Sequence, residues 1–304
     1  MYVIISQVVI LFAFAAVGFI LAKCGSVKQD HSVMLSKLLV NIFLPAGIFK
    51  TFACYCTVKY VSENINLISI SLVILLLISV LSFFGSKLLT KDKTERAIFE
   101  YSLIIPNFSY MGYSFAETLF GPLGLMNAIM FAIPMSVYTY TYGYCNLSRK
   151  RFTLRNLINP IMVSLVLGAV VGISEMGRYI PDMAMSFLDS ASVCMAPVSM
   201  LLTGIVVSEY GIKKSLKDPK LYIVSAMRLV LLPIAMGLVL LPLNDTVVLR
   251  NAVLLYCMPC GLNTIIFVKN AGENCEAGAG LALISNVLAI LSVPLVLMMF
   301  GINR

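Results

Sequence analysis

Long apolar stretches, separated by short polar or charged connections, cover almost the whole chain. A membrane-spanning helix needs about 20 predominantly apolar residues, and many of these stretches reach that length. Charge-free runs include Met1–Ala22, Asn64–Ser86, Thr118–Ser148, Asn156–Ser174, Ser190–Ser208 and Ala277–Asn303. Divided at charged or turn-rich breaks, the apolar stretches predict ten spanning helices: Val3–Ala22, Ser32–Ala53, Ile65–Ser86, Ser102–Phe120, Leu123–Tyr144, Asn156–Ser174, Asp189–Ser208, Leu221–Leu241, Val253–Val268 and Ala277–Phe300.

The composition agrees with this pattern. Hydrophobic residues make up 60% of the 304 residues and charged residues 12%, and the mean hydropathy is +0.96. A soluble domain carries about 25% charged residues, so this chain has too few to cover a surface that faces water. The sequence predicts an all-α membrane protein that crosses the lipid bilayer many times.

Charge and cysteine content exclude several other classes of protein. The net charge of +8 is attributed to basic cytoplasmic connections rather than to nucleic-acid binding. The pair Cys257-x-x-Cys260 lies inside an apolar stretch, where small buried side chains are a better interpretation than a metal or redox site. No nucleophile–base arrangement stands out. We therefore expect no catalytic residue, no metal and no cofactor, and we do not expect an enzyme.

The two halves of the chain repeat each other. Pro45 and Pro197 are 152 residues apart, and Pro106 and Pro259 are 153 apart. Each pair occupies matching places in the predicted helices, which indicates a five-helix unit present twice. The predicted units are residues 1–148, a short linker at 149–155, and residues 156–304.

An odd number of helices in each repeat inserts the second repeat upside down relative to the first. With the N-terminus outside, 17 of the 22 Lys and Arg residues fall in connections on the inside, including those of the linker Arg149–Arg155. Cytoplasmic connections carry such an excess of basic residues. We therefore expect a multi-pass protein of the cell's inner (plasma) membrane, with both termini outside and the linker in the cytoplasm.

Two of the predicted helices are interrupted at matching positions. The helix Ser102–Phe120 carries Pro106 followed by Asn107, and the helix Val253–Val268 carries Pro259. Proline removes a backbone donor and clashes one turn back. Freed backbone groups in a membrane are tolerated only where protein or a water-filled cavity covers them. Broken helices at corresponding positions of two halves indicate the binding site of a transporter.

Polar residues near the breaks are the candidates for substrate binding. Backbone N–H groups at the start of a half-helix favour a negatively charged ligand, and the amide of Asn107 is placed to donate to a carboxylate. The alternative is that the asparagines only satisfy backbone groups freed by proline, and that the tyrosines only pack. The candidate set is Pro106, Asn107, Ser109, Tyr110, Tyr113, Pro259, Asn263, Thr264 and Asn41.

Charged residues at membrane depth are costly and usually functional. The predicted spans contain Glu117 near one end of the fourth helix, Asp189 at the start of the seventh, and Arg228 in the eighth. Either acid could carry a coupling proton or could be solvated at an interface. Arg228 lies about 12 Å along the helix from Lys220, at 1.5 Å per residue. It could contact a buried anion, but snorkelling to the cytoplasmic surface is the favoured interpretation.

The segment PNFSYMGYS at Pro106–Ser114 resembles the P-N-x-x-x-M-G-x-P element of the auxin efflux carrier family, the PIN-like carriers and their bacterial relatives. The segments LLVNIFLPAGIF, APVSMLLTG and MPCGLNTIIFVKNAG resemble further family segments, and the likeness covers essentially the whole chain. The resemblance implies ten helices in two inverted repeats, with a scaffold part and a transport part. It also implies that the fourth and ninth helices cross at Pro106 and Pro259, and that an organic anion binds beside this crossing.

The connection between the halves is short, about Cys145–Arg155. It resembles that of the bacterial carriers, several of which are associated with dicarboxylates such as malate or malonate. We expect a secondary active transporter of a small organic anion, a mono- or dicarboxylate, that works by an elevator-like or rocking movement. The expected partners are this anion, the lipid bilayer and, as one alternative, a second copy of the chain in a homodimer.

Two other functions are kept as alternatives. A cation-coupled or cation-exchanging carrier of similar inverted-repeat fold would need a buried carboxylate pair near the crossing, and the predicted spans lack one. A membrane receptor would bind its ligand without transporting it.

The membrane orientation predicted from the charge distribution can be tested by cysteine labelling. Single cysteines at Ile302 and at Arg151, in a variant without other cysteines, should differ in their reaction with a membrane-impermeant thiol reagent. Because both termini are expected outside, Ile302→Cys should react in intact cells and Arg151→Cys only after permeabilisation. The opposite labelling pattern would refute the inverted-repeat orientation.

Overall fold

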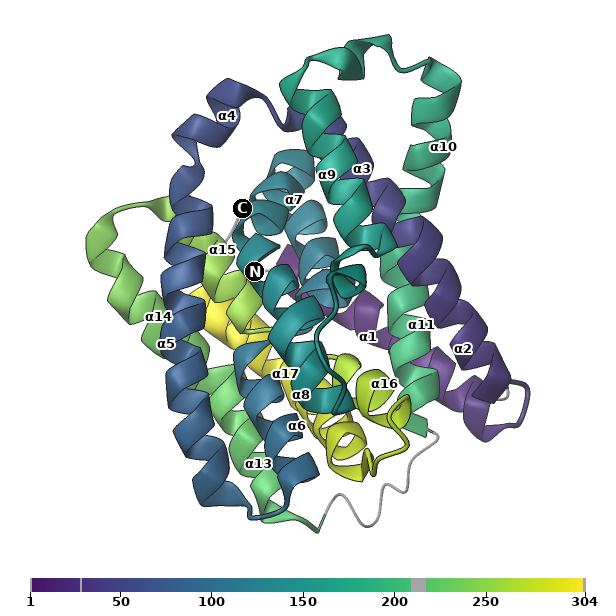
Figure 1. Ribbon diagram of the computed structural model, residues 1–304, viewed down its shortest axis with the longest axis vertical. Coiled ribbons are helices and arrows are strands. Elements are labelled where there is room, and N and C mark those ends of the chain that lie inside the picture. Colours follow the sequence, from purple (N-terminus) through teal and green to yellow (C-terminus); the bar gives the residue numbers. More distant parts are fainter. Residues whose placement is uncertain (1, 28, 209–216, 303–304) are drawn as a thin grey trace.

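The computed structural model describes residues 2–27, 29–208 and 217–302. Within these ranges all regular structure is helical (Figure 1), as the apolar runs predict. Lys28, Lys213, Lys214 and Arg304, which enter the charge count above, lie outside the described residues.

The first half of the chain contains α1 (Tyr2–Lys23), α2 (Gln29–Leu38), α3 (Leu44–Tyr55), α4 (Val58–Glu63), α5 (Ile65–Leu89), α6 (Lys93–Ile104), α7 (Tyr113–Tyr138) and α8 (Tyr144–Ser148). The second half contains α9 (Pro160–Ile173), α10 (Asp182–Val193), α11 (Met195–Ser208), α13 (Pro219–Ala226), α14 (Leu232–Leu240), α15 (Thr246–Tyr256), α16 (Asn263–Lys269) and α17 (Glu276–Met299). Single π-helical turns continue four of these helices: η1 (Leu39–Phe43), η2 (Phe108–Gly112), η3 (Thr139–Gly143) and η6 (Met227–Leu231).

In the described part of the chain, six helical segments are long and apolar enough to cross a membrane. They are His31–Tyr55, Ile65–Leu89, Phe108–Ser148, Asp182–Ser208, Pro219–Leu243 and Glu276–Met299. Shorter apolar helices cover Val9–Lys23, Pro160–Ile173 and Thr246–Tyr256. The 41-residue segment Phe108–Ser148 consists of two successive helices. It is interrupted at Gly121, whose φ of +69° favours glycine. This interruption confirms the predicted break between Phe120 and Leu123.

Three predicted helix starts are wrong. The ninth predicted helix begins at Thr246 instead of Val253, because Asp245 Oδ1 accepts hydrogen bonds from the Val247 and Val248 N–H groups and caps the first turn. The helix before Pro106 begins at Lys93 instead of Ser102, because Asp92 Oδ1 accepts a hydrogen bond from the Glu95 N–H at 2.7 Å and caps the first turn. The segment that contains Asp189 begins at Asp182, directly after Pro181, so Asp189 lies inside α10 instead of at its start. All three starts lie at charged residues, which the search for apolar runs passes over.

The helices assemble into two groups, each drawn from both halves of the chain. The first helix group consists of α1, α2, α3, α9, α10 and α11, in which α1 packs along α11 and α3 along α9. The second helix group consists of α5 to α8 and α13 to α17, in which α5 packs on α6 and α7, and α15 on α7 and α14. In Figure 1 the labels of the first group lie mainly on one side of the molecule and most of those of the second on the other.

Glycines allow the closest packing within the first helix group. A Cβ atom at Gly18 of α1 would lie 2.2 Å from the Leu201 carbonyl oxygen, and one at Gly204 of α11 would lie 1.9 Å from the Ala15 carbonyl oxygen. Small residues at such interfaces let two membrane helices approach at backbone distance. These two glycines therefore hold the first repeat against the second.

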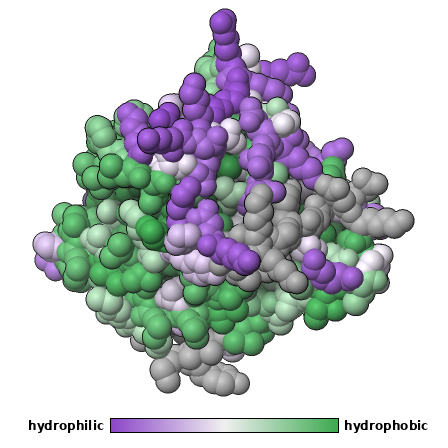
Figure 2. Space-filling view, turned by 90° about the horizontal axis from the view of Figure 1, so that it is seen from below, coloured by the Kyte–Doolittle hydropathy of each residue, from purple (hydrophilic) through white to green (hydrophobic). Residues whose placement is uncertain are grey.

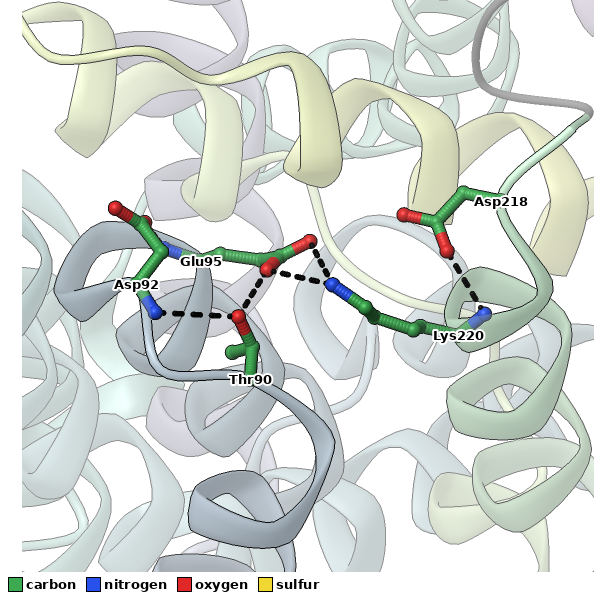
Figure 3. A network of polar contacts seen from close by, with 5 residues as sticks. All are labelled: Thr90, Asp92, Glu95, Asp218 and Lys220. Atoms are coloured by element: carbon green, nitrogen blue, oxygen red, sulfur yellow. Dashed lines mark hydrogen bonds and ion pairs between the residues drawn. The ribbon is translucent and has the colours of Figure 1, made fainter.

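A polar network ties the second helix group together at the end where α6 and α13 begin (Figure 3). Lys220 Nζ lies 3.1 Å from Glu95 Oε2, and the Thr90 hydroxyl donates to the same carboxylate. Asp92 N–H donates to Thr90 Oγ1 at 3.2 Å, and Lys220 N–H donates to Asp218 Oδ1 at 3.0 Å. Figure 2 views this end of the molecule and shows hydrophilic residues gathered beside a hydrophobic flank.

The flank of α5 is suited to lipid. Its exposed residues are almost all large and apolar: Leu72, Val73, Leu76, Leu77, Val80, Leu81 and Phe84. In a bilayer such a surface lies among acyl chains without loss of free energy.

The packing of α1 on α11 predicts a large difference between two glycine substitutions. Gly204→Ala places a methyl group against backbone atoms of Ala15, which cannot move aside as a flexible side chain could. We therefore expect the free energy of unfolding to fall by about 1–3 kcal/mol. Gly85→Ala in α5 is the matched control, because no atom lies within 4 Å of its Cβ position. The melting temperature in detergent should fall for the first variant and stay equal or rise for the second. Equal melting of both variants would contradict the close approach.

Candidate functional site

The two broken helices meet at their prolines. The helix α6 ends at Ile104 and η2 begins at Phe108, and α15 ends at Tyr256 and α16 begins at Asn263. Between these ends, the Asn107 N–H donates to the Pro259 carbonyl oxygen at 2.8 Å. Pro106 and Cys260 pair in the antiparallel sense. The expectation that the chain crosses itself at Pro106 and Pro259 is confirmed.

Other backbone groups at the two breaks also have partners within the protein. Proline cannot donate, so the helix bonds of α6 end with the Ile105 N–H, which donates to the Tyr101 carbonyl at 2.8 Å. In the second break the Cys260 N–H donates to Ser285 Oγ of α17 at 3.0 Å. These bonds bury the irregular backbone inside protein, which is the condition for its presence at membrane depth.

Arg228 lies at the carbonyl ends of both broken helices. Its Nη1 donates to the Leu103 carbonyl at 2.9 Å and its Nε to the Met258 carbonyl at 3.3 Å. The guanidinium carbon lies 5.1 Å from the centre of the Tyr256 ring, and the residue has 0% exposure. The favoured interpretation that Arg228 snorkels to the surface is wrong. Two carbonyl groups inside the protein bind its guanidinium instead.

The Asn107 side chain is buried and keeps a free donor. The residue is 3% exposed, and its Nδ2 has no hydrogen-bond partner in the described part of the protein. Its main-chain oxygen accepts from the N–H groups of Met111 and Gly112 at 3.3 and 3.0 Å. The main chain of Asn107, not its amide nitrogen, therefore bonds the groups freed by the proline. This arrangement counts against the alternative that the amide only satisfies the broken backbone.

Asn263 and Thr264 follow the second break but differ in their contacts. Asn263 Nδ2 donates to the Tyr101 hydroxyl at 2.9 Å, and that hydroxyl lies 3.4 Å from Thr139 Oγ1. Thr264 Oγ1 donates to the Gly261 carbonyl at 3.0 Å. Thr264 thus bonds to the local backbone, whereas Asn263 links α16 to α6.

The residues after Asn107 lie where the two helix groups meet. Ser109 is half-buried, and Tyr110 and Tyr113 are buried. Ser199 of α11 places its Oγ 3.0 Å from the Tyr110 carbonyl. The Tyr113 ring meets Phe108 edge to face at 5.7 Å between centroids. Three of the candidate residues therefore lie on the segment that the first helix group touches.

Three other candidates lie elsewhere. Asn41 is exposed in a groove lined by residues of α2 and η1, and its Nδ2 donates to the Lys37 carbonyl at 2.7 Å. The structure does not bring it to the crossing. Asp189 is exposed and forms an ion pair with the half-buried Lys50 of α3. Glu117 is half-buried beside a separate cavity.

The cavity beside Glu117 is polar and has a volume of about 620 Å³. Tyr60 donates to Asn127 Oδ1 at 2.7 Å, and the Arg250 guanidinium lies 4.5 Å from the Phe120 ring centre. Burial raises the pKa of Tyr60, which lies in the connecting helix α4, so its hydroxyl remains a donor. The cavity is lined by Tyr60, Glu117, Thr118, Leu119, Phe120, Gly121, Leu123, Gly124, Asn127 and Arg250.

Sequence reasoning missed one buried acid. Glu100 of α6 is 5% exposed, and its Oε1 accepts from the Tyr142 hydroxyl at 3.1 Å. It was missed because the helix was expected to begin at Ser102. The signal was present in Asp92 followed by Glu95, the spacing of a capping box. The broken helix therefore contains one buried carboxylate, which was not expected.

Comparisons with known proteins define the class of protein and then the family. The sequence model of a family described as membrane transport protein matches residues 3–152 and again 146–297. The chain is a membrane transporter, and it belongs to this family, which includes the PIN-like carriers that the segment after Pro106 resembles. The expected family membership is confirmed, and the two matches fit a protein built from two repeats.

Archaeal proteins are among the relatives. An uncharacterized transporter of Methanocaldococcus jannaschii, MJ1031, is 24% identical over 216 residues, which cover 68% of this chain and 70% of that protein. An uncharacterized transporter of Methanothermobacter thermautotrophicus is 20% identical over 289 residues, which cover 91% of this chain and 92% of that protein. The likeness to the second relative therefore extends over nearly the full length of both chains.

Proposed function

We propose that this transporter is a secondary carrier, not an enzyme, and that it moves a small organic anion, a mono- or dicarboxylate such as malate or malonate. One observation carries the proposal: two N–H donors at the crossing, Asn107 Nδ2 and Arg228 Nη2, are buried without a partner in the described residues. A buried donor without a partner costs about 1–3 kcal/mol. An anion that accepts from these donors would recover this free energy, and it would bring negative charge to a positively charged region.

Backbone dipoles support the same choice of ligand. The half-helix that begins with η2 directs its first N–H groups toward the crossing, where they favour negative charge. The second half-helix, α16, begins at Asn263, shortly after Pro259. Discontinuous helices of carriers commonly direct N-termini of this kind toward an anionic substrate.

The membrane arrangement in the proposal has ten spans. The first broken helix, which consists of α6, η2 and the part of α7 before Gly121, counts as one span. The rest of α7 together with α8 counts as the next span. The second broken helix, α15 with α16, also counts as one span. The two five-helix repeats then lie in opposite orientations, with both termini outside the inner (plasma) membrane. The 41-residue segment that is interrupted at Gly121 supports this division.

The two helix groups support a movement of one part against the other. The crossing belongs to the second helix group, and the first group reaches it through Ser199 of α11. In the proposed cycle the second group carries the anion past the first, as an elevator or by rocking. Bonds across the boundary, such as that between Ser199 and Tyr110, would exchange between the two end states.

Uptake into proteoliposomes tests the proposal. Purified protein should accumulate radiolabelled malate or malonate in a saturable way, above liposomes without protein. Because the substrate is charged, the rate should respond to an imposed membrane potential or pH gradient. Saturable binding of both anions without any flux would instead indicate a receptor, and absence of both binding and flux would exclude these substrates.

Asn107 is the residue on which the proposed site most depends. Asn107→Ala removes one donor to a charged acceptor, an interaction worth about 1.5–3 kcal/mol, so the affinity for the transported anion should fall about ten- to hundredfold. Asn107→Asp should bind more weakly still, because its carboxylate repels the substrate. Binding is to be measured on purified protein with unchanged melting behaviour.

A matched control for this experiment is Asn64→Ala. The Asn64 side chain donates to the Tyr60 carbonyl at 3.0 Å in a connecting turn, so its removal should leave the affinity unchanged. If both Asn107 variants bind like the parent protein, the anion site lies elsewhere.

A further inference from the structure

Arg228 is a permanent positive charge in the interior of the protein. Its exposure is 0%, and no carboxylate forms an ion pair with it in the described part of the chain. Arginine keeps its proton in proteins, so burial cannot be relieved by loss of the charge. The charge must therefore be stabilised by the dipoles around it.

Those dipoles are backbone carbonyl groups at helix ends. Leu103 lies in the last turn of α6, and Met258 follows the end of α15. The C-terminal end of a helix carries a partial negative charge, and here two such ends face one guanidinium. The Tyr256 ring, with its centre 5.1 Å from the guanidinium carbon, adds a cation–π contact.

The same kind of carbonyl set has a known use in broken-helix carriers. Unwound carbonyl groups and half-helix C-termini bind the coupling cation there, while half-helix N-termini face the anionic substrate. In this protein the carbonyl oxygens of Leu103 and Met258, at the ends of the two broken helices, already accept from Nη1 and Nε of Arg228 at 2.9 and 3.3 Å. A sodium ion would need the same oxygen lone pairs and would meet a fixed positive charge.

We propose that Arg228 is a built-in cation that occupies the place of a coupling sodium ion between the two broken helices. This inference rests on the proposed function, because only a carrier has a coupling ion. The guanidinium supplies the positive charge that the helix ends require in every state of the cycle. Sodium therefore does not bind at the crossing of the parent protein, and removal of the guanidinium opens the carbonyl oxygens to a small cation.

Thermal unfolding of purified protein in detergent, without any organic anion, tests this inference. A ligand that binds only the native state raises its stability. The parent protein should melt at the same temperature in sodium chloride and in choline chloride at about 0.15 M. Arg228→Met, which keeps a long side chain without charge, should melt lower in choline chloride. Sodium should then raise its melting temperature saturably, by about 2 °C or more.

Two further variants separate this role from a loss of packing. Arg228→Lys keeps a cation on the same helix and should not respond to sodium. Arg178→Met removes an exposed arginine that contacts Glu175 and Tyr179, and should also not respond. Stabilisation of the parent or of Arg228→Lys by sodium would overturn the inference, as would an Arg228→Met protein that melts alike in both salts.

If Arg228→Met cannot be purified in folded form, the parent and Arg228→Lys decide the question. Folded Arg228→Lys and a lack of sodium response in both proteins support a requirement for fixed positive charge, and a sodium response in either rejects it. Since no organic anion is present, a negative result here leaves the proposed anion transport standing. A failure of malate or malonate uptake likewise leaves the sodium result valid.

Discussion

Two helices that stop inside a membrane leave backbone N–H and C=O groups without helical partners, and lipid cannot supply any. In this protein one hydrogen bond joins the two breaks, and the side chain of a third helical segment bonds to both. The main chain of Asn107 donates to the carbonyl of Pro259, and the carbonyls at the ends of α6 and α15 accept from Arg228. The side-chain donors Asn107 Nδ2 and Arg228 Nη2 take no part in these bonds and have no partner among the described residues.

The parts of this arrangement that sequence could predict are those with a local cause. Proline disfavours a continuous helix, so Pro106 and Pro259 located both breaks, and a repeat of 153 residues paired them. Pro134 and Pro294, in contrast, lie inside helices that continue. The residues at which helices begin were harder to predict from the sequence. The start of α6 lies among charged residues, and only the capping pair Asp92 and Glu95 marks it in the sequence. A search for apolar runs alone therefore left the first turns of that helix, including Glu100, outside the predicted span.

The direction of a side chain could not be predicted, because it depends on contacts between distant segments. Arg228 bonds to a carbonyl 125 residues away, and Asn263 bonds to a hydroxyl 162 residues away. Distance along a helix says how deep a residue lies, but its rotation decides whether it faces lipid, water or another helix. The same uncertainty explains Asn41, which has the depth of a site residue but faces the surface groove of α2 and η1.

The pairing between Asn107 and Pro259 also bears on how the protein is made. The two residues are separated by 152 positions in the chain, so the donor enters the membrane long before its acceptor exists. At a synthesis rate of about 5–20 residues per second, roughly 8–30 s pass between them. During this interval the first broken helix needs another partner for its open backbone, such as water or the insertion machinery. The first repeat can therefore reach its final structure only after most of the second has been synthesised.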